Sequence, residues 1–187
     1  MSDLFGGKKD DWATPQWLFD ALDEEFDFGL DPCCYAHTAK CDLFFTEADD
    51  GLAQSWHGRS VYVNPPYSKM NDWMRKCADE SRKGAKVIVA LVPARTDTKA
   101  WQDTVLRTAD EIRFIRGRVQ FVGAEAGAKF PSALVIWRHR LNLLDRNPSR
   151  NPVKVGGFDI RGLKPKGAKG ARPRSTPSRT RSRPKRQ

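Results

Sequence analysis

The tetrapeptide Asn64-Pro65-Pro66-Tyr67 groups side-chain and backbone atoms that suit one kind of chemistry. An amino group on an aromatic ring is a poor nucleophile, because its lone pair is delocalised into the ring. Two acceptors, the Asn64 side-chain oxygen and the Pro65 carbonyl, could bind its two N–H groups and aim the nitrogen lone pair at a methyl donor. Tyr67 could stack on a base turned out of a nucleic acid. The residues therefore favour methylation of an exocyclic amine, with a turn that merely caps a strand as the alternative.

The apolar run Ser60 to Val63 comes directly before this tetrapeptide and predicts a buried strand. Neither proline can donate a hydrogen bond to a sheet, so the chain must leave the sheet at Asn64. The candidate catalytic turn then lies at the carboxyl end of a strand, where ligands bind in open α/β sheets.

Strands and helices alternate along the rest of the chain, which predicts a doubly wound α/β sheet. Thr14 is expected to cap the first helix, with Pro15 at its first helical position. The predicted helices span residues 15–25, 70–83 and 98–109, and the predicted strands span residues 26–30, 44–45, 60–63, 86–92, 111–115, 118–122 and 132–138. Short connections among the last three strands suggest an antiparallel element at one side of the sheet. No glycine-rich phosphate loop is present, which argues against nicotinamide enzymes and nucleoside triphosphatases.

The positive charge is concentrated at the carboxyl-terminal end. The chain of 187 residues carries a net charge of +10, yet residues 161–187 hold eleven lysines and arginines and no acid, which leaves −1 for residues 1–160. We expect a flexible segment at residues 1–11, one domain over residues 12–145, and a basic, disordered tail over residues 146–187. Such a tail suits binding to a phosphate backbone, or it only improves solubility. No apolar run reaches membrane-spanning length, and we expect a cytoplasmic protein without a membrane partner.

Several acidic and sulfur-containing side chains are candidates for ligand contacts. Asp31 ends the predicted strand over residues 26–30, where it could meet a hydroxyl or ammonium group or simply form an Asx turn. In the acidic turn at residues 46–52, one carboxylate could accept a hydrogen bond from an adenine amino group, or the turn is only solvated. The cysteines cluster with His37 without paired C-x-x-C spacing, so we expect small buried thiols, no metal and no disulfide.

These segments together resemble phage-type DNA N6-adenine methyltransferases over about residues 12–138. The resemblance is carried by Thr14-Pro15-Gln16-Trp17-Leu18-Phe19, Leu30-Asp31-Pro32-Cys33, Asp49-Asp50-Gly51-Leu52, Asn64-Pro65-Pro66-Tyr67-Ser68, Pro93-Ala94-Arg95-Thr96-Asp97-Thr98, Arg116-Gly117-Arg118-Val119-Gln120-Phe121 and the run from Phe130 to Trp137. The tetrapeptide alone is moderately specific, whereas the ordered set is strongly specific.

The resemblance implies a class I methyltransferase fold: a Rossmann-like mixed sheet with helices on both faces, here in a shortened form. It implies S-adenosylmethionine as the methyl donor. Thr14 and Pro15 would contact this cofactor, Asp31 would lie beside its methionine part, and Asp50 (or Asp49) would bind its adenine amino group. Asn64, Pro65, Pro66 and Tyr67 match the family's catalytic tetrapeptide.

Two departures from the family pattern bear on ligand binding. Asp31 is followed by Pro-Cys-Cys-Tyr in place of a glycine-rich turn, and no acidic residue can be assigned to the ribose of the cofactor. The chain also has no room for a large target-recognition domain, so DNA contacts must come from loops and the tail. Arg95, Arg116 and Arg118 lie at predicted strand ends and are candidates for these contacts, or they are ordinary surface arginines.

The leading hypothesis is methyl transfer from S-adenosylmethionine to adenine N6 in DNA, by direct displacement at the methyl group. In a phage this modification would shield DNA from restriction, and the enzyme would work in the host cytoplasm. A second hypothesis keeps the catalytic turn but changes the substrate to RNA, to a protein glutamine or to cytosine N4. A third is a DNA-binding protein without catalysis, in which the basic tail does most of the binding.

Overall fold

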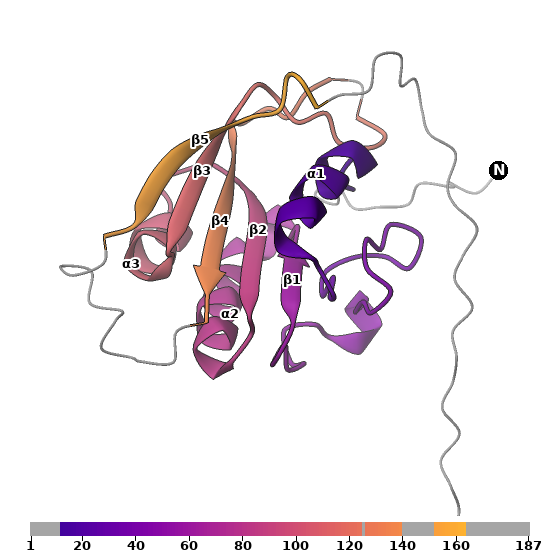
Figure 1. The fold of residues 1–187 in the computed structure, drawn as a ribbon, viewed down its shortest axis with the longest axis vertical. Coiled ribbons are helices and arrows are strands. Elements are labelled where there is room, and N and C mark those ends of the chain that lie inside the picture. Colours follow the sequence, from indigo (N-terminus) through magenta and orange to yellow (C-terminus); the bar gives the residue numbers. More distant parts are fainter. Residues whose placement is uncertain (1–11, 125, 140–151, 164–187) are drawn as a thin grey trace, which may run out of the picture.

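The computed structural model describes residues 12–124, 126–139 and 152–163, which form a five-stranded mixed sheet covered by helices (Figure 1). The strands are β1 (Ser60–Val63), β2 (Val87–Pro93), β3 (Glu111–Arg116), β4 (Ser132–Arg138) and β5 (Lys154–Asp159), in the order β1-β2-β4-β3-β5. β1 pairs parallel with β2 and β3 parallel with β5, whereas β4 is antiparallel to both of its neighbours. The predicted mixed α/β architecture is confirmed, and its antiparallel strand lies between β2 and β3.

The sheet continues beyond β1 through two single parallel bridges. Leu30 bridges to Val61 in β1, and Asp31 bridges to Phe44 on its other side. The strands predicted over residues 26–30 and 44–45 are reduced to these bridges. After Asp31 the chain therefore first forms a neighbour on one side, at Phe44, and then a neighbour on the opposite side, β1. Such a reversal is a topological switch point, the usual place for a ligand in an open α/β sheet.

Two apolar clusters hold helices against the two faces of the sheet. α1 (Gln16–Phe26) covers one face, and α2 (Met70–Lys83) with the π-helix η3 (Ala100–Val105) covers the other. Successive residues of a strand point to opposite faces, so each strand contributes to both clusters. In β2, Val89 and Leu91 pack with α1, and Ile88 and Ala90 pack with α2.

Two details of the predicted elements are wrong, and one helix is of an unexpected type. α1 begins at Gln16 with Pro15 in the N-cap position and no side-chain cap, because the Thr14 hydroxyl instead lies 2.7 Å from the Tyr62 phenol oxygen. The helix predicted over residues 98–109 is present, as the π-helix η3 followed by α3 (Leu106–Thr108). Residues 118–122 form only one bridge, from Val122 to Ala13, because both edges of β3 are already paired with β4 and β5.

The sheet also extends past the predicted domain boundary at residue 145. β5 runs parallel to β3 from the pair Glu111–Lys154 to the pair Arg116–Asp159, and the following Ile160 is buried. Residues 152–163 therefore belong to the folded part of the chain, although they were assigned to the tail. The rest of the predicted tail and the predicted flexible segment at residues 1–11 lie outside the described residues.

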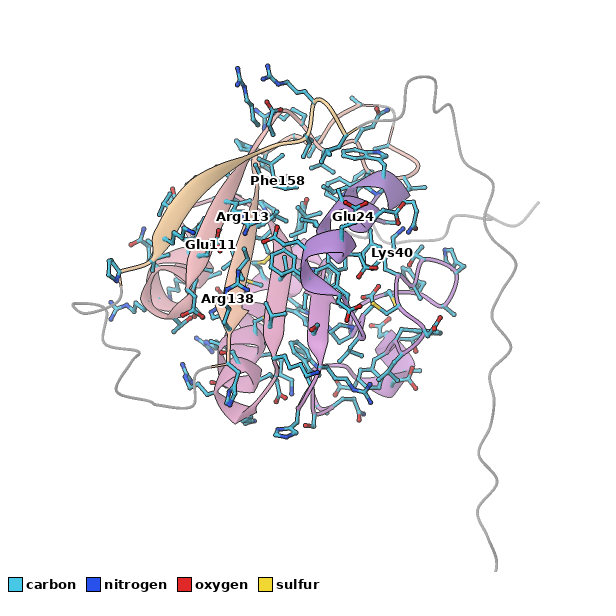
Figure 2. All side chains as sticks on the ribbon, viewed as in Figure 1. Glu24, Lys40, Glu111, Arg113, Arg138 and Phe158 are labelled. Atoms are coloured by element: carbon cyan, nitrogen blue, oxygen red, sulfur yellow. The ribbon has the colours of Figure 1, made fainter. Side chains whose placement is uncertain are left out.

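An ion network joins the end of α1 to the sheet (Figure 2). The Arg113 guanidinium donates to both oxygens of Glu25 at 2.6 Å and to Glu111 at 2.7 Å. Arg113 and Arg138 also lie over the Phe26 ring, 5.5 and 5.6 Å from its centroid. The hydrogen bond from Arg113 lowers the pKa of Glu25, as expected for a bidentate pair.

In the described ranges, no helix has the length and apolar character needed to cross a bilayer.

Candidate active site

The carboxyl ends of β1, β2, β3 and β5 meet at one edge of the sheet, the upper edge in Figure 1, because these four strands all run opposite to β4. Asn64 follows β1, Arg95 follows β2, and Arg116 ends β3. Asp31 lies at the same edge, since its neighbour Leu30 bridges parallel to β1. The structure thus brings the predicted catalytic turn to the same edge as predicted cofactor and DNA contacts.

The side chain of Asn64 is held by a segment that lies far away in the sequence. Its amide nitrogen donates to the Trp12 carbonyl at 2.5 Å and to the Thr14 hydroxyl at 3.1 Å. Because a backbone carbonyl can only accept, the nitrogen end of the amide must face Trp12. The Thr14 hydroxyl in turn lies 2.7 Å from the Tyr62 phenol oxygen, and Thr14 and Tyr62 are only 2% and 1% exposed. Burial raises the pKa of Tyr62 well above its ordinary value, so this phenol stays neutral.

A pocket of about 390 Å³ opens beside Tyr67. Its lining combines aromatic and apolar side chains with two cations, and it consists of Tyr67, Ser68, Met70, Asn71, Pro93, Arg95, Thr98, Lys99, Ala100, Trp101 and Phe130. The Arg95 guanidinium lies 5.2 Å from the centroid of the exposed Phe130 ring. The buried Trp101 donates its indole N–H to the Pro93 carbonyl at 2.9 Å, which fixes the wall of the pocket. The size and the lining fit a flat ligand that carries a nearby negative charge.

Asp31 is almost completely buried and organises the loop that follows it. One of its oxygens accepts the backbone N–H of Cys33 at 3.4 Å, and the other accepts that of Lys40 at 3.1 Å. Burial raises the pKa of Asp31 to about 6. In a chain without the glycine-rich turn, this carboxylate therefore binds the loop's own amides. The part of the chain that the structure covers holds no group of three or more histidine, cysteine or acidic side chains arranged to bind a metal.

The two acidic residues at 49 and 50 have different surroundings. Asp49 accepts hydrogen bonds from the backbone and the hydroxyl of Thr46, at 3.0 and 2.7 Å, in a capping box. Asp50 is exposed and takes a left-handed backbone conformation with φ of 50°. The carboxylate of Asp50 is thus presented to solvent, whereas the carboxylate of Asp49 stabilises the turn.

The acidic turn packs directly on the loop after Asp31. A Cβ atom added to Gly51 would lie 2.0 Å from the Pro32 carbonyl oxygen and 3.2 Å from the Trp73 ring. The Trp56 indole donates to the Gly51 carbonyl at 3.1 Å and fixes the turn from below. The buried indole N–H of Trp73 has no hydrogen-bond partner within the described residues. The two segments predicted to bind the cofactor are therefore neighbours, and the Trp73 ring packs against Gly51.

The remaining predicted residues differ in their contacts. Thr14 and Pro15 are buried, so their contact with a cofactor stays a prediction. Arg116 pairs with Asp159 at 3.7 Å, and the exposed Arg118 side chain lies beside Gly127. Sequence reasoning gave no role to Trp12, Tyr62, Lys99 or Phe130. A usable signal was present for Tyr62, because a tyrosine two residues before Asn64 on one strand must share its face of the sheet.

Comparison with known proteins identifies the family. A family model described as "DNA N-6-adenine-methyltransferase (Dam)" matches residues 1–144. A protein named DNA N-6-adenine-methyltransferase from Haemophilus phage HP1 (strain HP1c1) is 35% identical over 122 residues, which cover 64% of this chain and 70% of the relative. A protein of the same name from Escherichia phage T1 is 24% identical over 136 residues, covering 64% of this chain and 56% of the relative. The chain therefore belongs to the DNA N-6-adenine-methyltransferase (Dam) family.

Proposed function

We propose that the chain transfers a methyl group from S-adenosylmethionine to N6 of adenine in DNA, with the turn Asn64 to Tyr67 as the catalytic element. The observation that carries the proposal is the orientation of Asn64. Its nitrogen is bound to Trp12 and Thr14, so its oxygen, which has no hydrogen-bond partner among the residues described, can accept at the carboxyl edge of the sheet. Tyr67, three residues further on, lines a pocket of suitable size for a base. The family membership supports the same reaction.

The residues of the turn would act on the amino group of adenine. Asn64 Oδ1 and the Pro65 carbonyl accept its two N–H groups and draw the nitrogen toward a tetrahedral geometry. The ring of the base lies against Tyr67, with Phe130 across the pocket. The nitrogen forms its bond to the methyl carbon as the bond between that carbon and sulfur breaks, and the surplus proton on nitrogen then passes to water. Holding the amine in this position lowers the barrier chiefly through proximity.

The residues between Asp31 and the acidic turn fit S-adenosylmethionine. When bound, S-adenosylmethionine supplies an activated methyl group on a positively charged sulfur. Asp50 offers an exposed carboxylate for its adenine amino group, while Asp49 is engaged with Thr46. The indole N–H of Trp73, whose ring packs near Gly51, has no partner in the described part of the chain and could donate to an acceptor of the ligand.

The sheet supports a class I, Rossmann-like assignment. Phe44 lies on one side of Asp31, and β1 lies on the other side of Leu30. The cofactor would therefore lie on the Asp31 side of the turn and the base on the Tyr67 side. The catalytic turn between these two sites would then touch both ligands.

The DNA backbone would cross the rim of the base pocket. Arg95 and Lys99 line this rim and are both exposed, which suits contacts with phosphates that flank a flipped nucleotide. Arg116 is a weaker candidate because Asp159 already neutralises part of its charge. The basic residues at 164–187 would add phosphate contacts that weaken with salt.

The test uses purified protein, labelled S-adenosylmethionine and unmethylated DNA, which is then digested to nucleosides and analysed by mass. The variants are Asn64→Ala and Arg82→Ala. Arg82 makes an exposed ion pair in the last turn of α2, away from the carboxyl edge, and serves as the control. We expect N6-methyldeoxyadenosine from the parent and from Arg82→Ala, and none from Asn64→Ala. A methylated cytosine, or no methylated base from folded protein that binds DNA, would refute the proposal.

A further inference from the structure

The segment Trp12 to Thr14 occupies both hydrogens of the Asn64 amide. One hydrogen goes to the Trp12 carbonyl at 2.5 Å, and the other goes to the Thr14 hydroxyl at 3.1 Å. The two ends of a carboxamide have nearly the same size and shape, so packing alone cannot decide which end faces the substrate. Only the hydrogen-bonding character of the neighbours can decide it. The Trp12 carbonyl can only accept, and the Thr14 hydroxyl accepts from the nitrogen end when it donates its own proton to the Tyr62 oxygen.

We propose that Thr14 is a positioning residue that sets the orientation of the Asn64 side chain for methyl transfer. The inference rests on the proposed catalytic role of Asn64. With the nitrogen bound, Oδ1 is presented as an acceptor. A carboxamide turned by 180° would instead present its own N–H groups to the N–H groups of adenine, and the amine would be repelled.

Tyr62 fixes the hydroxyl of Thr14 in turn. Tyr62 and Asn64 are two residues apart at the end of an extended strand, so both side chains point to the face that α1 covers. The Tyr62 oxygen lies 2.7 Å from Thr14 Oγ1, and both side chains are closed off from water. A buried hydroxyl with a partner on each side has little freedom to rotate. The hydrogen-bonded chain Tyr62–Thr14–Asn64 therefore runs from the core to the reacting edge.

The backbone of the segment is held as well. Pro15 fixes the entry into α1 with φ of −65°, and Ala13 bridges to Val122 through a hydrogen bond of 2.9 Å. The Trp12 ring lies 6.4 Å from the Phe121 ring. These contacts place the Trp12 carbonyl opposite Asn64. They also explain why Thr14 does not cap α1, since its hydroxyl is already bound on the other side.

The test compares Thr14→Val, which has the same shape without the hydroxyl, with Thr14→Ser, which keeps the hydroxyl. Thr104→Val is the matched control, because it removes a buried hydroxyl from η3, outside the pocket lining. We expect Thr14→Val to lower kcat about 10- to 100-fold, while KM for DNA and Kd for S-adenosylmethionine change less than about twofold. Thr14→Ser should restore most of kcat. Tyr62→Phe should lower kcat less than Thr14→Val does.

A second measurement is independent of turnover. The side-chain amide of Asn64 can be followed by ¹H–¹⁵N NMR, assigned by its loss in Asn64→Ala, and its hydrogen exchange should be slow in the parent and faster in Thr14→Val. If Thr14→Val does not fold, the same exchange experiment on Tyr62→Phe decides the question. Unchanged kcat and unchanged exchange in the folded variant would overturn the inference, as would a change confined to KM. If Asn64→Ala itself remains active, the proposed function fails first.

Discussion

Replacing Gly51 by alanine tests whether the acidic turn must touch the loop after Asp31. The added Cβ would lie 2.0 Å from the Pro32 carbonyl oxygen, whereas ordinary contacts begin near 3.4 Å. The backbone conformation of Gly51 is not left-handed, so alanine would add no backbone strain and would act only through the steric overlap of its Cβ. The two segments must separate by more than an ångström, and neither contact is with a flexible side chain.

The expected cost has two parts. Overpacking of this kind costs about 1–3 kcal/mol. Moving Gly51 also weakens the hydrogen bond from the Trp56 indole to the Gly51 carbonyl, and a buried donor left unpaired costs about 1–3 kcal/mol. The free energy of unfolding should therefore fall by about 2–6 kcal/mol, which lowers Tm by roughly 5–20 °C for a domain of this size.

The assay is thermal unfolding followed by circular dichroism, with the binding of S-adenosylmethionine measured by calorimetry below the transition. Gly29→Ala is the matched control, because a Cβ at that exposed position meets no atom within 4 Å. Gly51→Ala should also bind the cofactor more weakly than the parent. A Tm for Gly51→Ala within about 2 °C of the Tm for Gly29→Ala would refute the close approach of the two segments.

Three further changes probe the sheet, the buried acid and the pocket. Arg113→Leu should lower the free energy of unfolding by about 1–2 kcal/mol, since it removes the bidentate pair to the partly exposed Glu25; urea unfolding measures it. Burial raises the pKa of Asp31 to about 6, so folded protein keeps a proton that unfolded protein loses above about pH 4. The contribution of Asp31 to stability should therefore fall by about 3 kcal/mol as pH rises from about 4 to 6, and unfolding at several pH values should show a smaller fall in Asp31→Asn. Phe130→Ala should raise KM for DNA roughly 5- to 150-fold with little change in Tm, because one base–aromatic contact is worth about 1–3 kcal/mol; steady-state kinetics measures it.

Each of these changes has a control. Arg82→Leu breaks an ion pair whose two side chains are 43% and 52% exposed, and it should leave stability nearly unchanged. An equal loss in Arg82→Leu and Arg113→Leu would contradict the special role of the bidentate pair. Identical pH profiles for the parent and Asp31→Asn would contradict the raised pKa. For the pocket, an unchanged KM in Phe130→Ala would show that the base does not contact Phe130.

Apolar patterns predicted most of the central fold. The runs that became β1, β2, β3 and β4 were predicted within one residue at each end, because buried strands need continuous or alternating apolar side chains. α2 was predicted from its apolar spacing and from Gly84, which ends it with φ of 111°. In these segments local preference and burial agree.

The missed elements depend on partners that a single segment does not reveal. β5 contains Gly156 and Gly157, and almost all of its residues are exposed, so nothing in its composition indicates a strand. These residues form a strand because they pair with β3. The reverse holds for residues 118–122, where Val119 and Phe121 are buried but both edges of β3 are already paired, with β4 and with β5.

The catalytic turn could be predicted because its chemistry lies within four consecutive residues. Its support could not, since Thr14 and Asn64 are 50 residues apart in sequence and meet only after α1 packs on β1. Trp12 contributes a backbone carbonyl, which no side-chain pattern can indicate. The pocket was missed for the same reason: Tyr67 and Phe130 come together only through the pairing of β2 with β4.

The segment Trp12 to Thr14 forms no strand of the sheet, and this has a consequence for thermal inactivation. One isolated bridge joins Ala13 to Val122, whose side chain is 60% exposed, and Trp12 is 37% exposed. Proteins open locally with a free energy that follows the buried contacts of each region, so this segment should detach at a lower cost than the sheet unfolds. Each such opening would release the Asn64 amide while the core stays intact. Activity should therefore decline with temperature before circular dichroism records any loss of structure. The highest temperature at which the enzyme works would then be set by the segment Trp12 to Thr14.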